Sequence, residues 1–354
     1  MLKNKCKVIG VMSGTSLDGI DLAYVTFEFD KVWQFNIELA ETLEYDTKWL
    51  KILQNLTSTS VEQLQIIDVN YTLYLAQVIK EFIKKNQIVH IDAICSHGHT
   101  ALHEPSKGLT YQIGNKNILS KDLNLTVICD FRVQDVELGG QGAPLVPIGD
   151  RLLFADYDYC LNLGGFANIS TEKEGKRIAY DICAVNTVLN HYSELLGYKY
   201  DDEGKIASKG KENEKLLNEL NSLDFFHQTF PKSLGIEWVK KEIFPIIDNY
   251  HINPQDVLRT FVEHIAFQIS RELIGNDKET VLITGGGAYN LFLIERIKSM
   301  TNKRIVIPNE LIINYKEAMI FGLLGVLKLR GEINCLSSVT GAKQDHSSGV
   351  IFRP

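Results

Sequence analysis

The sequence predicts an α/β protein with two related lobes. Its 354 residues exceed the roughly 100 to 200 that one domain usually holds, which favours two domains. A strand, a glycine-containing turn and a second strand occur near residue 13 and again near residue 164, and strand and helix patterns alternate in both halves. This weak internal duplication predicts two α/β lobes of similar design.

The first half opens with the pattern of a β-hairpin. Residues 8–12 are an apolar run, residues 13–19 are small and turn-rich, and residues 21–29 alternate like a strand. Apolar residues at helical spacing predict a helix over residues 61–85. Strands are expected at 93–96, 111–113 and 126–129. The run 135–147, rich in glycine and proline, indicates a crossover between the lobes.

The second half restarts the same order of elements. Strands are expected at residues 159–163, 168–171, 177–181 and 281–284, and helices at 185–196 and 255–274. We therefore expect an N-terminal lobe of residues 1–135, with residues 316–354 packing back onto it, and a C-terminal lobe of residues 136–315.

Composition and charge exclude several classes of protein. The net charge is −7 without a clustered basic stripe, which argues against a nucleic acid or an anionic membrane as partner. The longest apolar run, residues 318–327, is about half the length of a membrane span. The six cysteines include no CxxC pair, and the N-terminus lacks the apolar stretch of a signal peptide. We expect a cytoplasmic protein with reduced, buried thiols.

The first candidate site is the hairpin loop, whose relevant residues are Ser13, Gly14, Thr15, Ser16, Asp18 and Gly19. Small residues expose backbone N–H groups and hydroxyls that suit a phosphate, and Asp18 suits Mg²⁺, directly or through water. Neither a P-loop nor a Rossmann fingerprint is present. A plain hairpin turn with a capping aspartate is the alternative interpretation.

Two further glycine loops follow apolar strands. Gly164 and Gly165 lie between predicted strands, and Gly285, Gly286 and Gly287 lie between a strand and a helix. Paired glycines let a backbone approach a ligand closely. Three such loops in two similar lobes predict a nucleotide bound between the lobes.

Three polar residues are candidates for chemistry. Asp181 follows a predicted strand and precedes a helix, so it is either a catalytic carboxylate or the helix N-cap. Arg132 follows another strand and suits bidentate binding of a carboxylate or phosphate, or pairing with a structural acid. His97, His99 and His103 do not match zinc-site spacing, and a ligand-binding loop that carries His97 is the favoured interpretation.

Ordered motifs along nearly the whole chain resemble the anhydro-N-acetylmuramic acid kinase family. The motifs, in order, are GVMSGTSLDGID (10–21), SHGHT (96–100), YQIG (111–114), DFR (130–132), GGQGAPLVP (139–147), LNLGGFANIS (161–170), DEGKIASKGKENEKLL (202–217), PKSLGIEW (231–238), TGGGAYN (284–290) and KEA (316–318). MSGTSLDG and GGQGAPLVP are long and specific.

The resemblance implies a fold, a reaction and a set of roles. The fold is that of actin, the heat-shock ATPases and sugar kinases, with a ligand cleft between two lobes that holds ATP and Mg²⁺. The reaction uses ATP and water to convert 1,6-anhydro-N-acetylmuramic acid to N-acetylmuramic acid 6-phosphate in cell-wall recycling. The hairpin loop would bind the ATP phosphates, and the glycines near 164 and 285 would bind the nucleotide. Asp181 would be the catalytic base, and His97, Arg132 and Glu317 would lie near the sugar.

The chain departs from the family pattern at two places. Asp181 is followed by Ile182, Cys183 and Ala184 instead of Thr-Gly-Pro, and His99 replaces a glutamine. Two alternatives therefore stay open: a kinase of another anhydro-sugar such as levoglucosan, and an inactive nucleotide-binding protein of the same fold. The expected oligomer is a homodimer. Lobe closure on ligand would place hinges near residues 135–147 and before Lys316.

Overall fold

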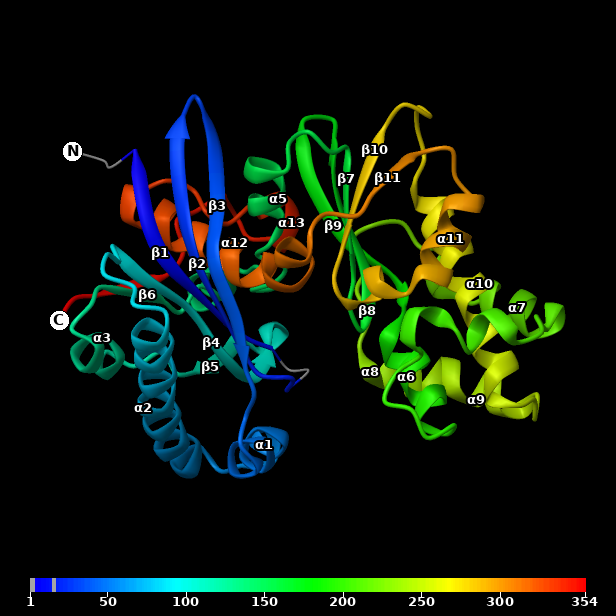
Figure 1. Cartoon of the computed structure of the whole chain (residues 1–354), viewed down its shortest axis with the longest axis horizontal. Coiled ribbons are helices and arrows are strands. Elements are labelled where there is room, and N and C mark those ends of the chain that lie inside the picture. Colours follow the sequence, from blue (N-terminus) through cyan, green and yellow to red (C-terminus); the bar gives the residue numbers. More distant parts are fainter. Residues whose placement is uncertain (1–3, 15–16) are drawn as a thin grey trace. The chain divides into compact units, whose positions relative to one another are not determined.

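The structure is a computed structural model, and it describes residues 4–14 and 17–354 (Figure 1). The chain forms two compact units. Unit 1 comprises residues 1–153 and 315–354, and unit 2 comprises residues 154–314. Each unit is built around its own β-sheet.

Among the described residues, unit 1 contains a seven-stranded sheet in the order β12-β6-β4-β1-β2-β3, with β5 paired to β4. Its strands are β1 (Lys5–Ser13), β2 (Ile20–Asp30), β3 (Val32–Leu43), β4 (Ala93–Glu104), β5 (Leu109–Ile113), β6 (Val127–Cys129) and β12 (Val350–Phe352). β1 pairs antiparallel with β2 and parallel with β4. The hairpin that the sequence predicts is confirmed.

Unit 2 repeats this arrangement in a five-stranded sheet of order β11-β10-β7-β8-β9. Its strands are β7 (Tyr159–Leu163), β8 (Phe166–Lys173), β9 (Lys176–Ala184), β10 (Thr280–Thr284) and β11 (Arg304–Val306). β7 pairs antiparallel with β8 and parallel with β10, as β1 does with β2 and β4. Both units thus place a three-stranded antiparallel meander beside parallel strands. The predicted internal duplication and the predicted α/β class are confirmed.

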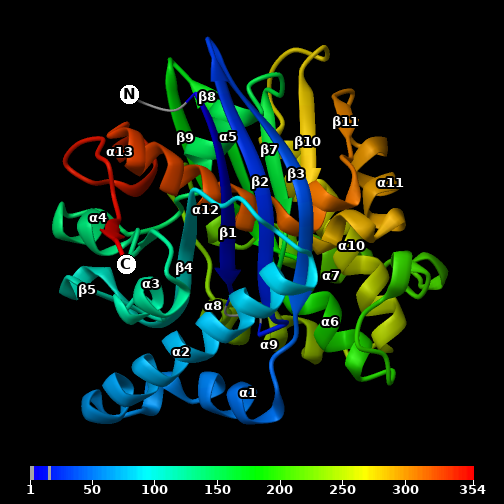
Figure 2. The same ribbon diagram turned by 60° about the vertical axis from the view of Figure 1, so that its left-hand side comes forward.

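The helices of unit 1 surround its sheet, and those of unit 2 pack on the second sheet (Figure 2). The helices of unit 1 that precede unit 2 along the chain are α1 (Thr47–Gln54), α2 (Val61–Lys85), α3 (Ile118–Leu123), α4 (Val133–Glu137) and α5 (Pro147–Leu153). Those of unit 2 are α6 (Asn186–Glu194), α7 (Glu214–Asn221), α8 (Ile236–Trp238), α9 (Phe244–Asn249), α10 (Pro254–Glu272) and α11 (Leu291–Ser299). α12 (Glu310–Arg330) crosses the unit boundary, and α13 (Ser337–Thr340) follows it.

The central strand β1 is buried on both faces because its side chains alternate between two helical layers. Ile9 and Val11 belong to a core cluster with residues of α1 and α2. Gly10 faces the other layer, where a Cβ atom would lie 1.8 Å from the carbonyl oxygen of Ala318 in α12. This close approach requires glycine at position 10, and it fixes α12 against the strand that leads into the Ser13 loop.

Unit 2 has one large core on the helical face of its sheet. Leu161 and Leu163 of β7 and Ile283 of β10 pack in a cluster with buried residues of α6, α10 and α11. The α10 helix begins at Pro254, and the side chain of its N-cap Asn253 accepts a hydrogen bond from the N–H of Asp256. The carboxyl ends of β7 and β10 are thereby held side by side.

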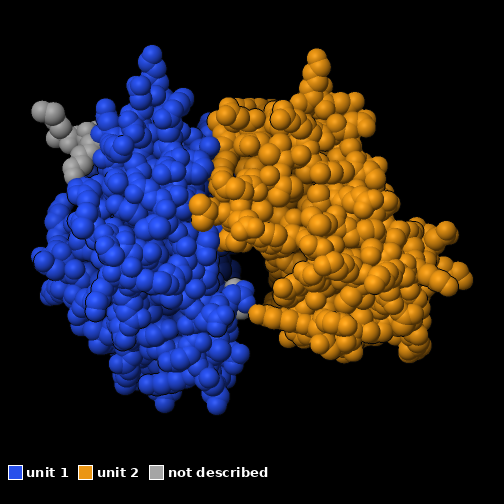
Figure 3. Space-filling view, viewed as in Figure 1, with its two compact units in different colours: residues 1–153, 315–354 blue, residues 154–314 orange. Residues whose placement is uncertain are grey.

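The chain passes from unit 1 into unit 2 after residue 153 and returns to unit 1 after residue 314; Figure 3 colours the two units separately. The lobe boundary predicted after residue 135 falls earlier than this division. Segment 136–153 belongs to unit 1 because α5 packs on α12: Lys316 Nζ lies 2.7 Å from Asp150 Oδ1, and both side chains are buried. Strand β3 has no counterpart in the expected elements. None of the described helices is both long and apolar enough to cross a membrane.

Candidate functional site

The loop between β1 and β2 begins at Ser13 and ends at Gly19. Gly14, Asp18 and Gly19 lie in the described part of this loop, whereas the predicted phosphate-binding residues Thr15 and Ser16 lie outside the described residues. Gly19 has a φ of +152°, and a Cβ atom there would lie 2.7 Å from the carbonyl oxygen of Leu43. The glycine is therefore required by the turn into β2. Asp18 is exposed, so its carboxylate is free to meet a ligand.

Ser13 lies at the centre of a buried hydroxyl network. Its Oγ is 2.5 Å from Tyr45 Oη, 2.9 Å from Tyr71 Oη and 2.8 Å from His99 Nδ1. A serine hydroxyl offers one donor and two acceptor positions, so these three contacts use all of them. Burial lowers the pKa of His99 to about 4, which keeps its ring neutral at neutral pH. The hydroxyl of Ser13 thus fixes the end of β1, and its hydrogen-bonding positions are all used within unit 1.

His97 and Arg132 form one polar unit in the core of unit 1. His97 Nδ1 lies 2.8 Å from the carbonyl oxygen of Gly98, and Arg132 Nε donates to His97 Nε2 at 2.8 Å. Burial lowers the pKa of His97 well below its usual value, and the charge of Arg132 adds to this. The neutral ring with its proton on Nδ1 satisfies both contacts. Arg132 Nη1 also donates to the carbonyl oxygen of Gly142 at 2.6 Å, which leaves other N–H groups of the guanidinium for a ligand.

Three carboxylates gather near the start of β2 and on α12. Asp21 accepts a hydrogen bond from Thr42 Oγ1 at 2.6 Å. Desolvation raises the pKa of Asp21 to about 6, and the negative charges of Glu317 and Asp18 add to the rise. The charge of Glu317 also acts on Arg132, whose pKa is lowered by burial and raised by that carboxylate. Asp21 is therefore close enough to interact electrostatically with Asp18 and Glu317, and Glu317 with Arg132.

The glycine loops of unit 2 meet at the carboxyl ends of β7 and β10. Gly285 has a φ of +81°, and a Cβ atom there would lie 2.8 Å from the carbonyl oxygen of Leu163. Gly287 would likewise meet Leu163 Cβ at 2.7 Å. The start of α6 closes the other side of the turn, since Asn186 N donates to the carbonyl oxygen of Gly164 and Thr187 N to that of Gly165, both at 3.2 Å.

This edge of the sheet leaves part of its backbone accessible. Gly165 and Gly286 are exposed, and side chains at these positions are absent, so a planar group can lie against the backbone. The carboxyl edge of parallel strands is also the edge at which α/β sheets bind ligands. Gly164, Gly165, Gly285, Gly286 and Gly287 are therefore brought together, as the sequence predicts for one site.

Asp181 lies within β9 rather than at its end. β9 continues to Ala184 because it pairs with β8 as far as Phe166, and Ile182 forms a bulge opposite Ala167 and Asn168. The N-cap of α6 is Val185, so the helix-cap alternative for Asp181 is wrong. Asp181 Oδ2 accepts a hydrogen bond from Leu234 N at 2.8 Å, and its other carboxylate oxygen is left for chemistry. Desolvation raises the pKa of this carboxyl, against the hydrogen bond from Leu234.

The predicted residues thus form two groups, one in each unit. The Ser13 loop, His97, Arg132 and Glu317 lie in unit 1, and Asp181 and the five glycines lie in unit 2. Asp21 is not among the site residues predicted from the sequence, although it ends the GVMSGTSLDGID motif and a carboxylate there could have indicated a role. Asn186, which the sequence retains downstream of Asp181, was given no role there, and its Nδ2 lies 3.5 Å from the carbonyl oxygen of Leu163 beside the glycine turn.

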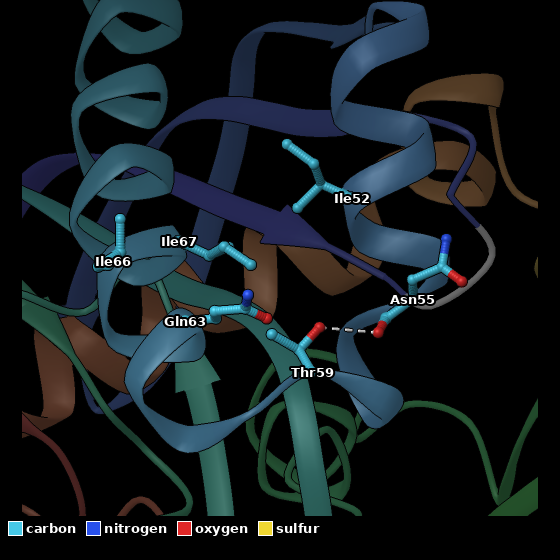
Figure 4. Close-up of a pocket in the computed structure, with 6 residues that line it drawn as sticks. All are labelled: Ile52, Asn55, Thr59, Gln63, Ile66 and Ile67. Atoms are coloured by element: carbon cyan, nitrogen blue, oxygen red, sulfur yellow. Dashed lines mark hydrogen bonds between the residues drawn. The ribbon is translucent and has the colours of Figure 1, made fainter.

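A surface hollow of about 350 Å³ lies elsewhere, between α1 and α2 (Figure 4). It is lined by Ile52, Asn55, Thr59, Gln63, Ile66 and Ile67. Thr59 Oγ1 donates to the carbonyl oxygen of Asn55 at 2.9 Å, which closes the turn at one side of the hollow. None of these six residues is among the predicted site residues, so the hollow is separate from both groups.

Known proteins similar to this chain share its full length. Residues 6–354 match the family model described as anhydro-N-acetylmuramic acid kinase. The anhydro-N-acetylmuramic acid kinase of Mannheimia succiniciproducens is 36% identical, with 97% of this chain and 98% of the relative aligned. That of Sulfurimonas denitrificans is 32% identical over the same shares. The solved activator of 2-hydroxyisocaproyl-CoA dehydratase from Clostridium difficile with bound ADPNP covers 88% of this chain and 91% of its own, with 13% identity and a TM-score of 0.44.

Proposed function

Because the chain belongs to the anhydro-N-acetylmuramic acid kinase family, we propose that it is the ATP-dependent kinase that opens and phosphorylates 1,6-anhydro-N-acetylmuramic acid. The product is N-acetylmuramic acid 6-phosphate, an intermediate of cell-wall recycling. The observation that carries the roles below is Asp181, a partly buried carboxylate with one oxygen anchored and a raised pKa.

The anhydro-sugar dictates two coupled bond changes. Its O6 is tied to C1, so it carries no free hydroxyl at C6. Water attacks C1, the C1–O6 bond breaks, and O6 takes the γ-phosphoryl group of ATP, which releases ADP. We assign Asp181 as the base that takes the proton of the attacking water. It resembles the base of an inverting glycosidase, which activates water on the face opposite the leaving oxygen.

A raised pKa suits Asp181 for this role. A carboxylate with a higher pKa is a stronger base, provided that it is still ionised at the working pH. The hydrogen bond from Leu234 N holds Oδ2, so Oδ1 is the oxygen that would take the proton. The bulge at Ile182 sets the direction of the Asp181 side chain in β9, since a bulge turns the residues beside it.

We assign nucleotide binding to the glycine turns and to the β1–β2 loop. Gly164, Gly165 and Gly285–Gly287 would hold the nucleoside part, and the backbone N–H groups near Ser13, Gly14 and Gly19 would hold the phosphates. The carboxylates of Asp18 and Asp21 are oxygen donors of the kind that Mg²⁺ prefers, and Asp18 is exposed. They would hold Mg²⁺ directly or through water. The ion would supply positive charge to the transferring phosphoryl group.

We assign sugar recognition to Arg132, with Glu317 beside it. The lactyl carboxylate of the muramic acid sugar is matched by a guanidinium, whereas levoglucosan has no such group. His97 would act through Arg132, because both of its ring nitrogens have partners within unit 1. Parallel assays of ATP consumption with anhydro-N-acetylmuramic acid, levoglucosan and no sugar test this assignment. Equal turnover with levoglucosan would exclude the lactyl group as a specificity element.

The decisive test of the base is the substitution Asp181→Asn. An amide keeps the shape and can still accept the hydrogen bond from Leu234 N, but it cannot take a proton. We expect turnover to fall by about 10²- to 10⁴-fold while ATP affinity stays within experimental error. Turnover within threefold of the parent would refute the assignment.

A matched control is Asp158→Asn at the opposite end of β7. Asp158 Oδ2 accepts a hydrogen bond from Thr280 N at 2.7 Å, so it is an aspartate anchored to a backbone N–H in the same unit. We expect this variant to keep full turnover. The parent should also show an acid limb in its pH profile of kcat/KM, since protonation of Asp181 removes the base. The limb should lie above the ordinary aspartate range, because desolvation raises this pKa.

A further inference from the structure

Three buried side chains of unit 1 converge outside the groups described above. Asp135 lies on α4, and Cys335 and His346 lie on either side of α13 near the C-terminus. The Cys335 thiol donates a hydrogen bond to Asp135 Oδ1 at 3.1 Å, and His346 Nε2 lies 3.6 Å from the same oxygen. The three candidate ligand atoms lie within 4.8 Å of one another, and the residues are 0%, 1% and 5% exposed. Figure 2 shows α4 and α13 on the same side of unit 1.

The backbone directs the thiol and the imidazole to the same point. Cys335 and His346 form an isolated antiparallel bridge, in which each N–H donates to the carbonyl oxygen of the other at 3.1 Å. Directly opposite residues of an antiparallel pair project their side chains to the same face. Asp135 faces this pair from α4. The convergence therefore follows from local geometry and needs no ligand to hold it.

The imidazole of His346 has one nitrogen without a partner. Its Nδ1 lies 3.1 Å from the carbonyl oxygen of Gln344, which requires a proton on Nδ1. Nε2 is buried and has no hydrogen-bond partner among residues 4–14 and 17–354. Its lone pair thus lies 3.6 Å from a carboxylate oxygen, an arrangement that a cation between the two atoms would stabilise. Histidines that bind metals commonly have this form, with the second N–H donated to a carbonyl.

We propose that Asp135, Cys335 and His346 bind one divalent transition-metal ion of the zinc class. Thiolate, imidazole and carboxylate are the donors that Zn²⁺ prefers, and a tetrahedral site with bonds of about 2.0–2.3 Å sets its ligand atoms roughly 3.4–3.6 Å apart. Both measured separations from Asp135 Oδ1 are within about half an ångström of this range. A thiolate and a carboxylate would balance the charge of the ion, which suits a buried site.

The surrounding hydrogen bonds would orient the ligands. Thr340 Oγ1 donates to Asp135 Oδ1 at 2.7 Å, and Gly142 N donates to Asp135 Oδ2 at 2.7 Å. The carbonyl oxygen of the same Gly142 accepts the hydrogen bond from Arg132. The ion would therefore join the C-terminal segment to the loop that positions Arg132. It would be distinct from the Mg²⁺ assigned to Asp18 and Asp21, because those carboxylates would supply oxygen donors alone.

The test is metal binding by the full chain after treatment with a chelator. We expect one equivalent of Zn²⁺ to bind in the presence of excess Mg²⁺. Co²⁺ in its place should give a thiolate-to-metal charge-transfer band and the intense visible bands of a tetrahedral site. Cys335→Ser should abolish the charge-transfer band. Thr340→Val, which removes an orienting hydrogen bond, should weaken binding by about 10- to 100-fold.

Two matched controls exclude general effects of losing a buried residue. Cys160→Ala removes a buried thiol of unit 2, and His264→Gln removes a buried imidazole whose Nε2 also lacks a hydrogen-bond partner in the described chain. Both should keep the full Co²⁺ spectrum. If Cys335→Ser does not fold, X-ray absorption of the metal-loaded parent decides, with one sulfur in the coordination shell expected. No charge-transfer band at millimolar Co²⁺, or a shell without sulfur, would overturn the proposal.

Discussion

At the scale of the residue, the surroundings of each polar group decide what it can do. His97 and His99 both have lowered pKa values because they are buried, so neither carries charge at neutral pH. Each has a different task, since His97 supports Arg132 and His99 contacts Ser13. Asp21 and Asp181 both have raised pKa values for the same physical reason, desolvation. A desolvated carboxylate that stays ionised lowers the free energy of unfolding, and this loss can be measured.

The substitution Asp21→Asn should stabilise the protein at neutral pH and leave stability at acid pH unchanged. The folded-state pKa of about 6 lies above that of the unfolded chain, about 3.9. Protonated Asp21 stabilises the folded protein fully at a pH below the pKa of the unfolded chain. This stabilisation is lost as the pH rises through about 6, the pKa in the folded protein. Two pKa units correspond to nearly 3 kcal/mol, and partial exposure reduces this to about 1–2 kcal/mol at pH 7.5.

Urea unfolding at pH 4 and at pH 7.5 measures this difference. Glu28→Gln, at the exposed end of the same strand, is the control. Glu28 Oε2 lies 3.5 Å from Lys5 Nζ in a pair that is more than half exposed, so its loss should change stability by well under 1 kcal/mol at either pH. An equal gain for Asp21→Asn at both pH values would show that its charge is not the cause.

At the scale of the element, the Ser13 loop of unit 1 and the glycine turns of unit 2 lie where strands end. The β1–β2 turn and the β7–β8 turn occupy corresponding places in two sheets of the same order, and the turn after β10 lies beside the second of them. Gly10 and Gly285 serve different purposes there. Gly10 allows α12 to contact β1, whereas Gly285 adopts a φ of +81° that side chains rarely take. Substitution at Gly285 should therefore affect ligand binding as well as stability.

We expect Gly285→Ala to weaken nucleotide binding by at least about tenfold. The new Cβ atom would lie 2.7 Å from Asn162 Oδ1 and 2.8 Å from the carbonyl oxygen of Leu163, so the turn must shift by several tenths of an ångström. The backbone of Gly285, with φ of +81° and ψ of 165°, lies in a region that is essentially limited to glycine, which adds a cost of roughly 1–3 kcal/mol. Calorimetric titration with a non-hydrolysable ATP analogue measures the affinity.

Gly175→Ala separates the two effects. Gly175 has a φ of +76° in the β8–β9 turn, and a Cβ atom there meets no atom within 4 Å. This variant should lose a similar amount of stability from its backbone conformation and keep full nucleotide affinity. If Gly285→Ala also binds the analogue as tightly as the parent, the turn after β10 is not part of the nucleotide site.

At the scale of the whole molecule, the chain passes between its units twice, after residue 153 and after residue 314. The second passage lies within α12, which carries Lys316 and Glu317. Kinases of this kind exclude bulk water during phosphoryl transfer by closing around their substrates. We therefore expect hinges at these two passages. The first of them lies after residues 135–147, where the sequence predicts a hinge.

Small-angle scattering should show the units drawing together. The radius of gyration should decrease with a non-hydrolysable ATP analogue and anhydro-N-acetylmuramic acid together, and less with either ligand alone. Inorganic phosphate with levoglucosan is the control and should leave the curve unchanged. An identical radius with and without both saturating ligands would contradict closure.

The sequence by itself determined the elements that depend on local pattern. The helix over residues 61–85 and the strand over residues 159–163 agree with α2 and β7 at both ends, because apolar periodicity is a local property. The motifs identified the family, and with it the fold and the type of reaction. The glycine turns could be predicted for the same reason, because glycine residues in a sequence indicate places where the backbone can approach another group closely.

Only the tertiary structure decided what depends on contacts between distant residues. β9 extends past Asp181 because β8 pairs with it, and segment 136–153 joins unit 1 because Asp150 pairs with Lys316. The meeting of Asp135 with Cys335 and His346 spans about 200 residues of sequence, and no local spacing predicts it. The pKa of Asp21 likewise arises from burial and from the charge of Glu317. Burial and long-range pairing belong to the packed molecule, so residue patterns alone do not contain them.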